Sequence, residues 1–109
     1  MRIIEGAGEF IPPGNGPNHW VEQLRVTQLS VGTYCIPAGG TDDQSPHHQD
    51  EIYVAIAGRA VLETGSGQAE VTTGSVIYVP AGESHTFTKI TEDLTLLVIF
   101  APAYESQQS

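Results

Sequence analysis

Apolar and polar residues alternate with a period of two over several short stretches of the chain. Between 20 and 36 apolar residues recur at every second position with one slip, and 85–90 alternates again. Nearly continuous apolar runs cover 51–57 and 94–100. A period of two places successive side chains on opposite faces of a strand, and short continuous runs are typical of buried strands. We therefore expect strands in these segments and in three others: 60–64, 68–73 and 75–79.

Glycine and proline separate these segments. Gly58 and Arg59 follow one apolar run directly and predict a tight turn between two strands, and the slip within 20–36 predicts a bulge or a turn. The segment 6–18, rich in Gly and Pro, predicts an irregular arm. Because no stretch has a helical period of useful length, the many short strands favour a sandwich or a barrel.

The length of 109 residues corresponds to one domain with a modest core. We expect an N-terminal arm at 1–19, the β-domain at 20–104 and a polar tail at 105–109.

Charge narrows the range of partners. The chain has 13 acidic and 4 basic residues and a net charge of −9. The bases do not cluster, so nucleic acid and anionic membrane surfaces are disfavoured as partners.

Cys35 is the single cysteine, the first ten residues lack an apolar core of signal-peptide length, and no run approaches bilayer-spanning length. These features favour the cytoplasm.

Three of the four histidines lie in two places that can carry chemistry. His47 and His48 precede Glu51, and His85 opens a later strand. Residues four apart on a strand share a face, so His47 and Glu51 would lie together, and His85 could join them across the sheet. Two imidazoles and a carboxylate form a facial triad that binds a metal and leaves positions open for substrate or oxygen.

Two motifs around these residues resemble the cupin family. Its second motif is Gly, five residues, Pro, any residue, Gly, two residues, His, three residues, Asn. The chain has Gly74, SVIYV, Pro80, Ala, Gly82, Glu, Ser, His85, TFT and then Lys89 in place of Asn. The first cupin motif ends in Glu, six residues, Gly, which Glu51, IYVAIA and Gly58 match. The resemblance spans 39–102 and implies an all-β, double-stranded β-helix (jelly-roll) barrel in a single domain.

The beginning of the first motif departs from the family pattern. Cupins place His, any residue, His before the Glu, whereas here Ser45 stands at the first of these positions and His47 at the second. The resemblance thus implies that His47, Glu51 and His85 bind one divalent ion, whether Fe, Mn, Ni or Zn. Gln44 could supply an amide oxygen as a fourth ligand. His48 is the other possible substitute, although in a regular strand it faces away from His47.

The resemblance implies a small organic molecule as substrate or ligand but no single reaction. Cupins include dioxygenases, isomerases, lyases, cyclases and non-catalytic binders. A dioxygenase is the favoured expectation, because three protein ligands suit a redox-active ion.

Tyr53 lies two residues after Glu51, on the same face of the strand, and should therefore point into the barrel as a residue of the pocket wall. We also expect a homodimer, in which the arm or 20–36 crosses or extends the partner's sheet.

Overall fold

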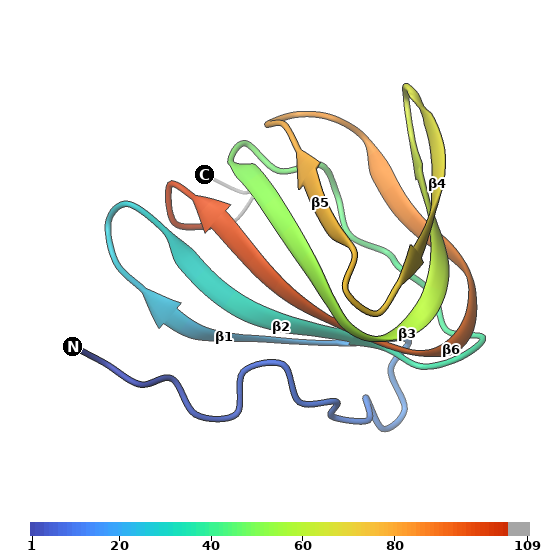
Figure 1. Ribbon diagram of the computed structural model, residues 1–109, viewed down its shortest axis with the longest axis horizontal. Coiled ribbons are helices and arrows are strands. Elements are labelled where there is room, and N and C mark those ends of the chain that lie inside the picture. Colours follow the sequence, from blue (N-terminus) through green and yellow to red (C-terminus); the bar gives the residue numbers. More distant parts are fainter. Residues whose placement is uncertain (105–109) are drawn as a thin grey trace.

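The computed structural model describes residues 1–104 of the chain, and the predicted tail at 105–109 lies outside them. The described residues form six strands and no helix: β1 His19–Arg25, β2 Ser30–Ile36, β3 Asp50–Thr64, β4 Gly67–Thr72, β5 Val76–Val79 and β6 His85–Ala101. All pairings are antiparallel. The strand order is β1-β2-β6-β3-β4. β5 pairs with the first part of β3, along the same edge as β4 and opposite β6. The sheet curls back on itself, with β1 and β2 toward one side of the molecule and β4 toward the other (Figure 1). The prediction of an all-β jelly-roll fold is confirmed.

Two long strands, β3 and β6, form the spine of the barrel. They have 15 and 17 residues and pair along almost their whole length. The prediction of a tight turn at Gly58 is therefore wrong, because β3 runs through this position without reversing. The register shifts near Gly58 show a local irregularity instead. Gly58 has a φ of 104°, and a Cβ here would lie 2.3 Å from the carbonyl oxygen of Asp93. This glycine lets β3 bend against β6.

The predicted break between 85–90 and 94–100 is also absent, since both segments belong to β6. Lys89 within β6 has a φ of 49°, the only non-glycine residue in 1–104 with a positive φ. The slip within 20–36, between Gln28 and Leu29, proves to be the turn that separates β1 from β2. A register shift between Glu22 and Leu24 is a separate irregularity within β1.

Alternate residues of the strands fill the interior of the barrel. The largest fully buried apolar side chains are Tyr53, Phe87, Ile36, Leu94 and Leu96. On the outside, the N-terminal arm lies along β2. The amide of Gly8 donates to Thr33 Oγ1 at 2.9 Å, and the amide of Ile11 donates to Cys35 Sγ at 3.3 Å. The arm thus covers Thr33 and Cys35, both of which are buried although they lie on the outer face.

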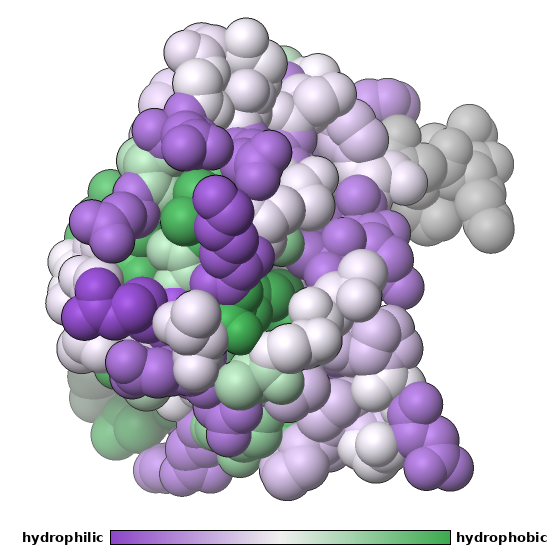
Figure 2. Space-filling model, turned by 90° about the vertical axis from the view of Figure 1, so that its right-hand side faces the viewer, coloured by the Kyte–Doolittle hydropathy of each residue, from purple (hydrophilic) through white to green (hydrophobic). Residues whose placement is uncertain are grey.

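The surface on the side of β4 is mixed in character. Hydrophobic atoms reach it between hydrophilic ones (Figure 2). Residues 1–104 contain no helix that is long and apolar enough to cross a bilayer.

Candidate metal centre

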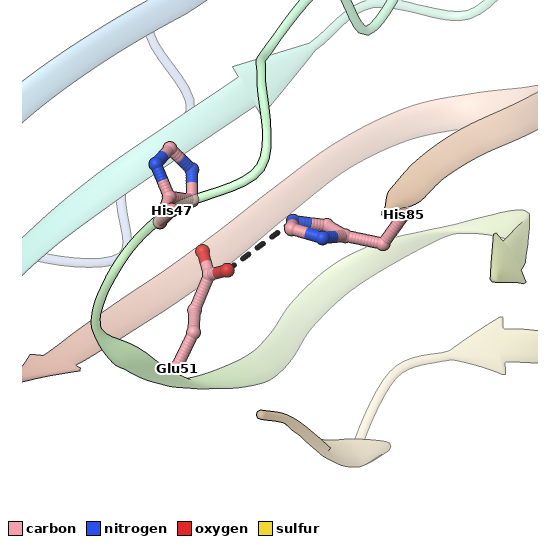
Figure 3. Close-up of side chains that lie close together, drawn as sticks. All are labelled: His47, Glu51 and His85. Carbon is pink, nitrogen blue, oxygen red and sulfur yellow. Dashed lines mark ion pairs between the residues drawn. The ribbon is translucent and has the colours of Figure 1, made fainter. Parts of the chain in front are cut away.

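Three side chains from separate parts of the chain converge inside the barrel. His47 lies in the loop before β3, Glu51 near the start of β3, and His85 at the start of β6. They point toward one another (Figure 3), and one potential ligand atom of each lies within 4.8 Å of the others. All three residues are buried, whereas His48 is exposed. His47 lies outside the strand in which we expected it, but the alternation of buried and exposed residues extends back to it.

The orientation of His85 is set by a backbone carbonyl. Its Nδ1 lies 2.8 Å from the Glu83 oxygen and donates to it, so in the neutral ring Nε2 carries the lone pair. Nε2 faces the Tyr53 hydroxyl at 2.9 Å and Glu51 Oε1 at 3.2 Å. Burial lowers the pKa of His85, but the Glu51 carboxylate and the Glu83 carbonyl outweigh it and leave the pKa raised. A proton or a metal ion at Nε2 would relieve the repulsion between this lone pair and the carboxylate.

Gln44 directs its amide oxygen at the same space. Its Nε2 donates to Asp42 Oδ2 at 3.0 Å, which leaves Oε1 to accept from the Tyr53 hydroxyl and from His47 Nε2, each at 3.0 Å. Burial lowers the pKa of His47, so this ring is neutral and carries a single N–H. With that proton on Nε2, the lone pair of His47 is on Nδ1. Burial and then the Glu51 carboxylate raise the pKa of Tyr53, so its hydroxyl remains a donor.

Asp42 fixes the loop that carries Gln44 and His47. Its Oδ1 accepts from the Tyr34 hydroxyl at 2.7 Å, and its Oδ2 accepts from the Phe87 amide at 2.8 Å. These bonds tie the loop to β2 and β6, on two sides of the site. Burial and the adjacent Asp42 raise the pKa of Tyr34, which keeps its hydroxyl protonated as the donor. Asp42 is therefore a positioning residue for the Gln44 amide.

Unpaired atoms at the centre of the cluster fit a cation. Within residues 1–104 neither carboxylate oxygen of Glu51 has a hydrogen-bond donor, and His47 Nδ1 also lacks a partner. Leaving buried carboxylate oxygens without donors is costly. Two imidazoles, a carboxylate and an amide oxygen form a donor set that suits Fe, Mn, Ni or Zn. The residues present therefore fit a divalent ion.

Sequence reasoning located the three converging residues but missed their supports. Asp42 and the hydroxyl of Tyr53 belong to the hydrogen-bond network of the site. Tyr53 was expected to point inward, and it is fully buried. No local pattern distinguishes Asp42 from its neighbour Asp43, which is exposed. Its role depends on the Phe87 amide, 45 residues away in sequence.

Comparisons with known proteins agree with this architecture. The family model described as "Cupin domain" matches residues 32–100. An uncharacterized protein of Streptomyces coelicolor, SCO3923, is 48% identical over 83 residues, which cover 76% of this chain and 79% of that protein.

Solved structures show the same fold at low sequence identity. A conserved Klebsiella pneumoniae protein with a double-stranded β-helix domain has a TM-score of 0.75 at 19% identity, with 90% of this chain and 92% of that chain covered. A cupin family protein of Methanocaldococcus jannaschii has a TM-score of 0.73 at 14% identity, with 94% and 91% covered. Together with the family match, these likenesses show that the chain belongs to the cupin family and folds as its double-stranded β-helix.

Proposed function

We propose that this cupin binds one divalent metal ion through His47, Glu51 and His85, with Gln44 Oε1 as a fourth ligand, and acts on a small organic molecule at the remaining coordination positions. The observation that carries the proposal is the Glu51 carboxylate. It is 2% exposed and lacks hydrogen-bond donors among the described residues, and it lies between two imidazoles. A divalent ion bound here would neutralise the Glu51 carboxylate and make its burial tolerable.

The side chains around the ion have distinct tasks. A bound ion would supply Lewis acidity, and if it were iron it would also supply redox chemistry with oxygen. Glu51 would lower the net charge of the buried centre. The Tyr53 hydroxyl now donates its one proton to Gln44 Oε1 and lies 2.9 Å from His85 Nε2. With Gln44 Oε1 bound to the ion, this proton would be released to hydrogen-bond an oxygen of the bound molecule. The dioxygenase is our favoured activity, because the chain supplies three or four ligands and leaves room for both substrate and oxygen.

Alanine substitutions test the ligand set. His85→Ala and His47→Ala should each remove most of the metal from protein purified without an affinity tag, as measured by elemental analysis. The circular dichroism spectrum should remain that of a β-protein. His48→Ala is the matched control. Its side chain is exposed, so metal content should not change.

The outcomes separate the alternatives. Loss of metal in His48→Ala but not in His47→Ala would show that the ligands are assigned one residue away from their true positions. If none of the three substitutions alters metal content, a non-catalytic small-molecule binder replaces the enzyme. Iron with oxygen uptake supports the dioxygenase, whereas tightly bound zinc without oxygen uptake supports an isomerase, lyase or cyclase.

We further propose that two copies of the chain associate. The sequence placed the contact at the arm or at 20–36, but the arm is bonded to β2 of its own chain, so we propose the outer face of β3 and β5 instead. Ile52 pairs with Tyr78 and Val54 with Val76 in the register of these strands. Tyr78 and Val76 are 60% and 67% exposed, and Ile52 is 37% exposed. Adjacent exposed apolar side chains on a sheet face favour contact with a second surface.

A further inference from the structure

A cavity of about 180 Å³ opens beside the candidate metal centre. His47, Gln44 and Glu51 form part of its wall, so any molecule in the cavity also faces the site. An apolar cavity of about 150 Å³ is large enough to hold benzene. The cavity therefore has room for a molecule of about one six-membered ring.

Aromatic rings form much of the remaining wall. Trp20 lies edge-on to Tyr34, Phe100 and Tyr104, with ring centroids 6.1 to 6.5 Å apart. Phe100 and Tyr104 lie against each other at 4.8 Å. These rings offer apolar surface for packing against a planar molecule.

The wall is held in place before any ligand binds. Trp20 packs over Gly32, where a Cβ would lie 2.2 Å from the indole ring, so only glycine leaves space for it. Tyr104 is held through its backbone: its amide donates to Ser30 Oγ at 2.8 Å, and its carbonyl accepts from Arg25. Fixed aromatic side chains bind a ring at a small entropic cost.

The charged residues of the wall are all acidic. Asp43 and Glu51 line the cavity, and no Lys or Arg of the described chain does so. Arg25 is engaged by Glu22 and the Tyr104 carbonyl, and Arg59 lies 3.5 Å from Glu92. A carboxylate or phosphate on a bound molecule would thus find no cationic side chain in the cavity, and only the ion of the proposed centre could neutralise it.

From the ring-sized volume, the aromatic wall and the absence of a cationic side chain from it, we infer that the cavity binds the uncharged planar ring of a molecule of about one six-membered ring, packed against Trp20, Phe100 and Tyr104. An anionic group on that molecule could be held only by the ion of the proposed centre and not by the wall. This inference deepens the proposed function by naming the class of substrate. The aromatic wall itself forms without a metal, so binding of a ring can be measured separately from binding of an ion.

Two probes of the same shape test the inference. Benzamide is neutral and benzoate is anionic, and Trp20 is the single tryptophan of the chain, so its fluorescence reports occupancy of the cavity. In the full chain freed of metal by a chelator, benzamide should change the fluorescence with saturation. Benzoate should bind at least about tenfold more weakly, because it meets two carboxylates at short range. Equal or tighter binding of benzoate would overturn the inference.

Substitutions locate the effect. Tyr104→Leu should weaken the binding of benzamide by about fivefold, because one aromatic contact is lost. Tyr78→Leu, on the outer face of β5, should leave it unchanged. Asp43→Lys places a cation at the exposed edge of the cavity. It should strengthen the binding of benzoate until its affinity approaches that of benzamide. If Tyr104→Leu and Tyr78→Leu behave alike, the ring does not bind at this wall.

Repeating the titration with one equivalent of zinc separates this inference from the proposed function. Benzamide binding by a chain that holds neither zinc nor Fe(II), Mn(II) or Ni(II), each added at one equivalent, would sustain the inference and refute the metal centre. Zinc binding by a chain whose fluorescence does not respond to benzamide would do the reverse.

Discussion

Lys89 occupies a backbone conformation that suits other residues better. Its φ of 49° lies in the left-handed region, which costs an ordinary side chain about 1–2 kcal/mol and is tolerated best by Gly and Asn. The cupin motif has Asn at this position. The structure therefore indicates that the last residue of the motif is selected for this backbone conformation. Lys89 adopts the conformation although its side chain is less suited to it.

Lys89→Asn should raise the free energy of unfolding by up to about 1 kcal/mol, because Asn relieves the cost of the left-handed conformation. Chemical denaturation measures the change. Lys89→Gln is the control, since it removes the same charge without gaining access to this conformation. If the two variants are equally stable, charge rather than backbone geometry governs the position.

At the candidate metal centre, the sequence was sufficient to predict the residues that belong to a motif of fixed spacing. Motif spacing placed His47, Glu51 and His85 together, and strand parity turned Tyr53 inward and His48 outward. The alternation of side chains along a strand does not predict side-chain directions in the loop before β3. Whether Gln44 reaches the site depends on Asp42, whose contacts to Tyr34 and Phe87 exist only in three dimensions.

At the scale of the element, β3 and β6 are longer than local patterns suggest. Gly58 interrupts an apolar run, and glycine in a strand is equally consistent with a turn or with a close approach of backbones. The long-range contact to Asp93 decides between them, and sequence alone does not reveal it. The strands 68–73 and 75–79 were predicted to within one residue at each end, because turns of ordinary composition bound them.

Gly58→Ala and Gly74→Ala distinguish backbone conformation from close approach. Both glycines have a positive φ, 104° and 94°, but a Cβ at Gly74 meets nothing within 4 Å. Gly74→Ala should therefore cost about 1–2 kcal/mol of stability. Gly58→Ala should cost more than about 3 kcal/mol, since its Cβ would overlap backbone atoms of β6 that cannot move independently.

Denaturant midpoints of the two variants, or the soluble yield if Gly58→Ala fails to fold, measure the difference. Similar losses for both would mean that β3 and β6 separate at this point without penalty, contrary to the continuous pairing in the structure.

At the scale of the whole molecule, the two faces of the β3 region serve different purposes. Inward residues Glu51 and Tyr53 build the candidate site, and the outward residues Ile52 and Val54 contribute to the apolar strip proposed to bind a second copy. Because side chains alternate along a strand, one short segment specifies both functions. Association on the outer face would then buttress the strand that carries Glu51 without blocking the cavity.

Light scattering tests this assembly. The chain should have twice its monomer mass of 11.6 kDa at micromolar concentration, and Val76→Lys should shift it to the monomer. The lysine places a charge in the centre of the proposed contact but does not disturb the fold, because Val76 is 67% exposed in the single chain. Val26→Lys, in the turn after β1 and 41% exposed, should keep the dimer mass. A monomer mass for the unaltered chain would refute the dimer, and a Val76→Lys dimer would move the interface to another surface. The N-terminal arm would then be the next surface to test, because it already lies along the outer face of β2.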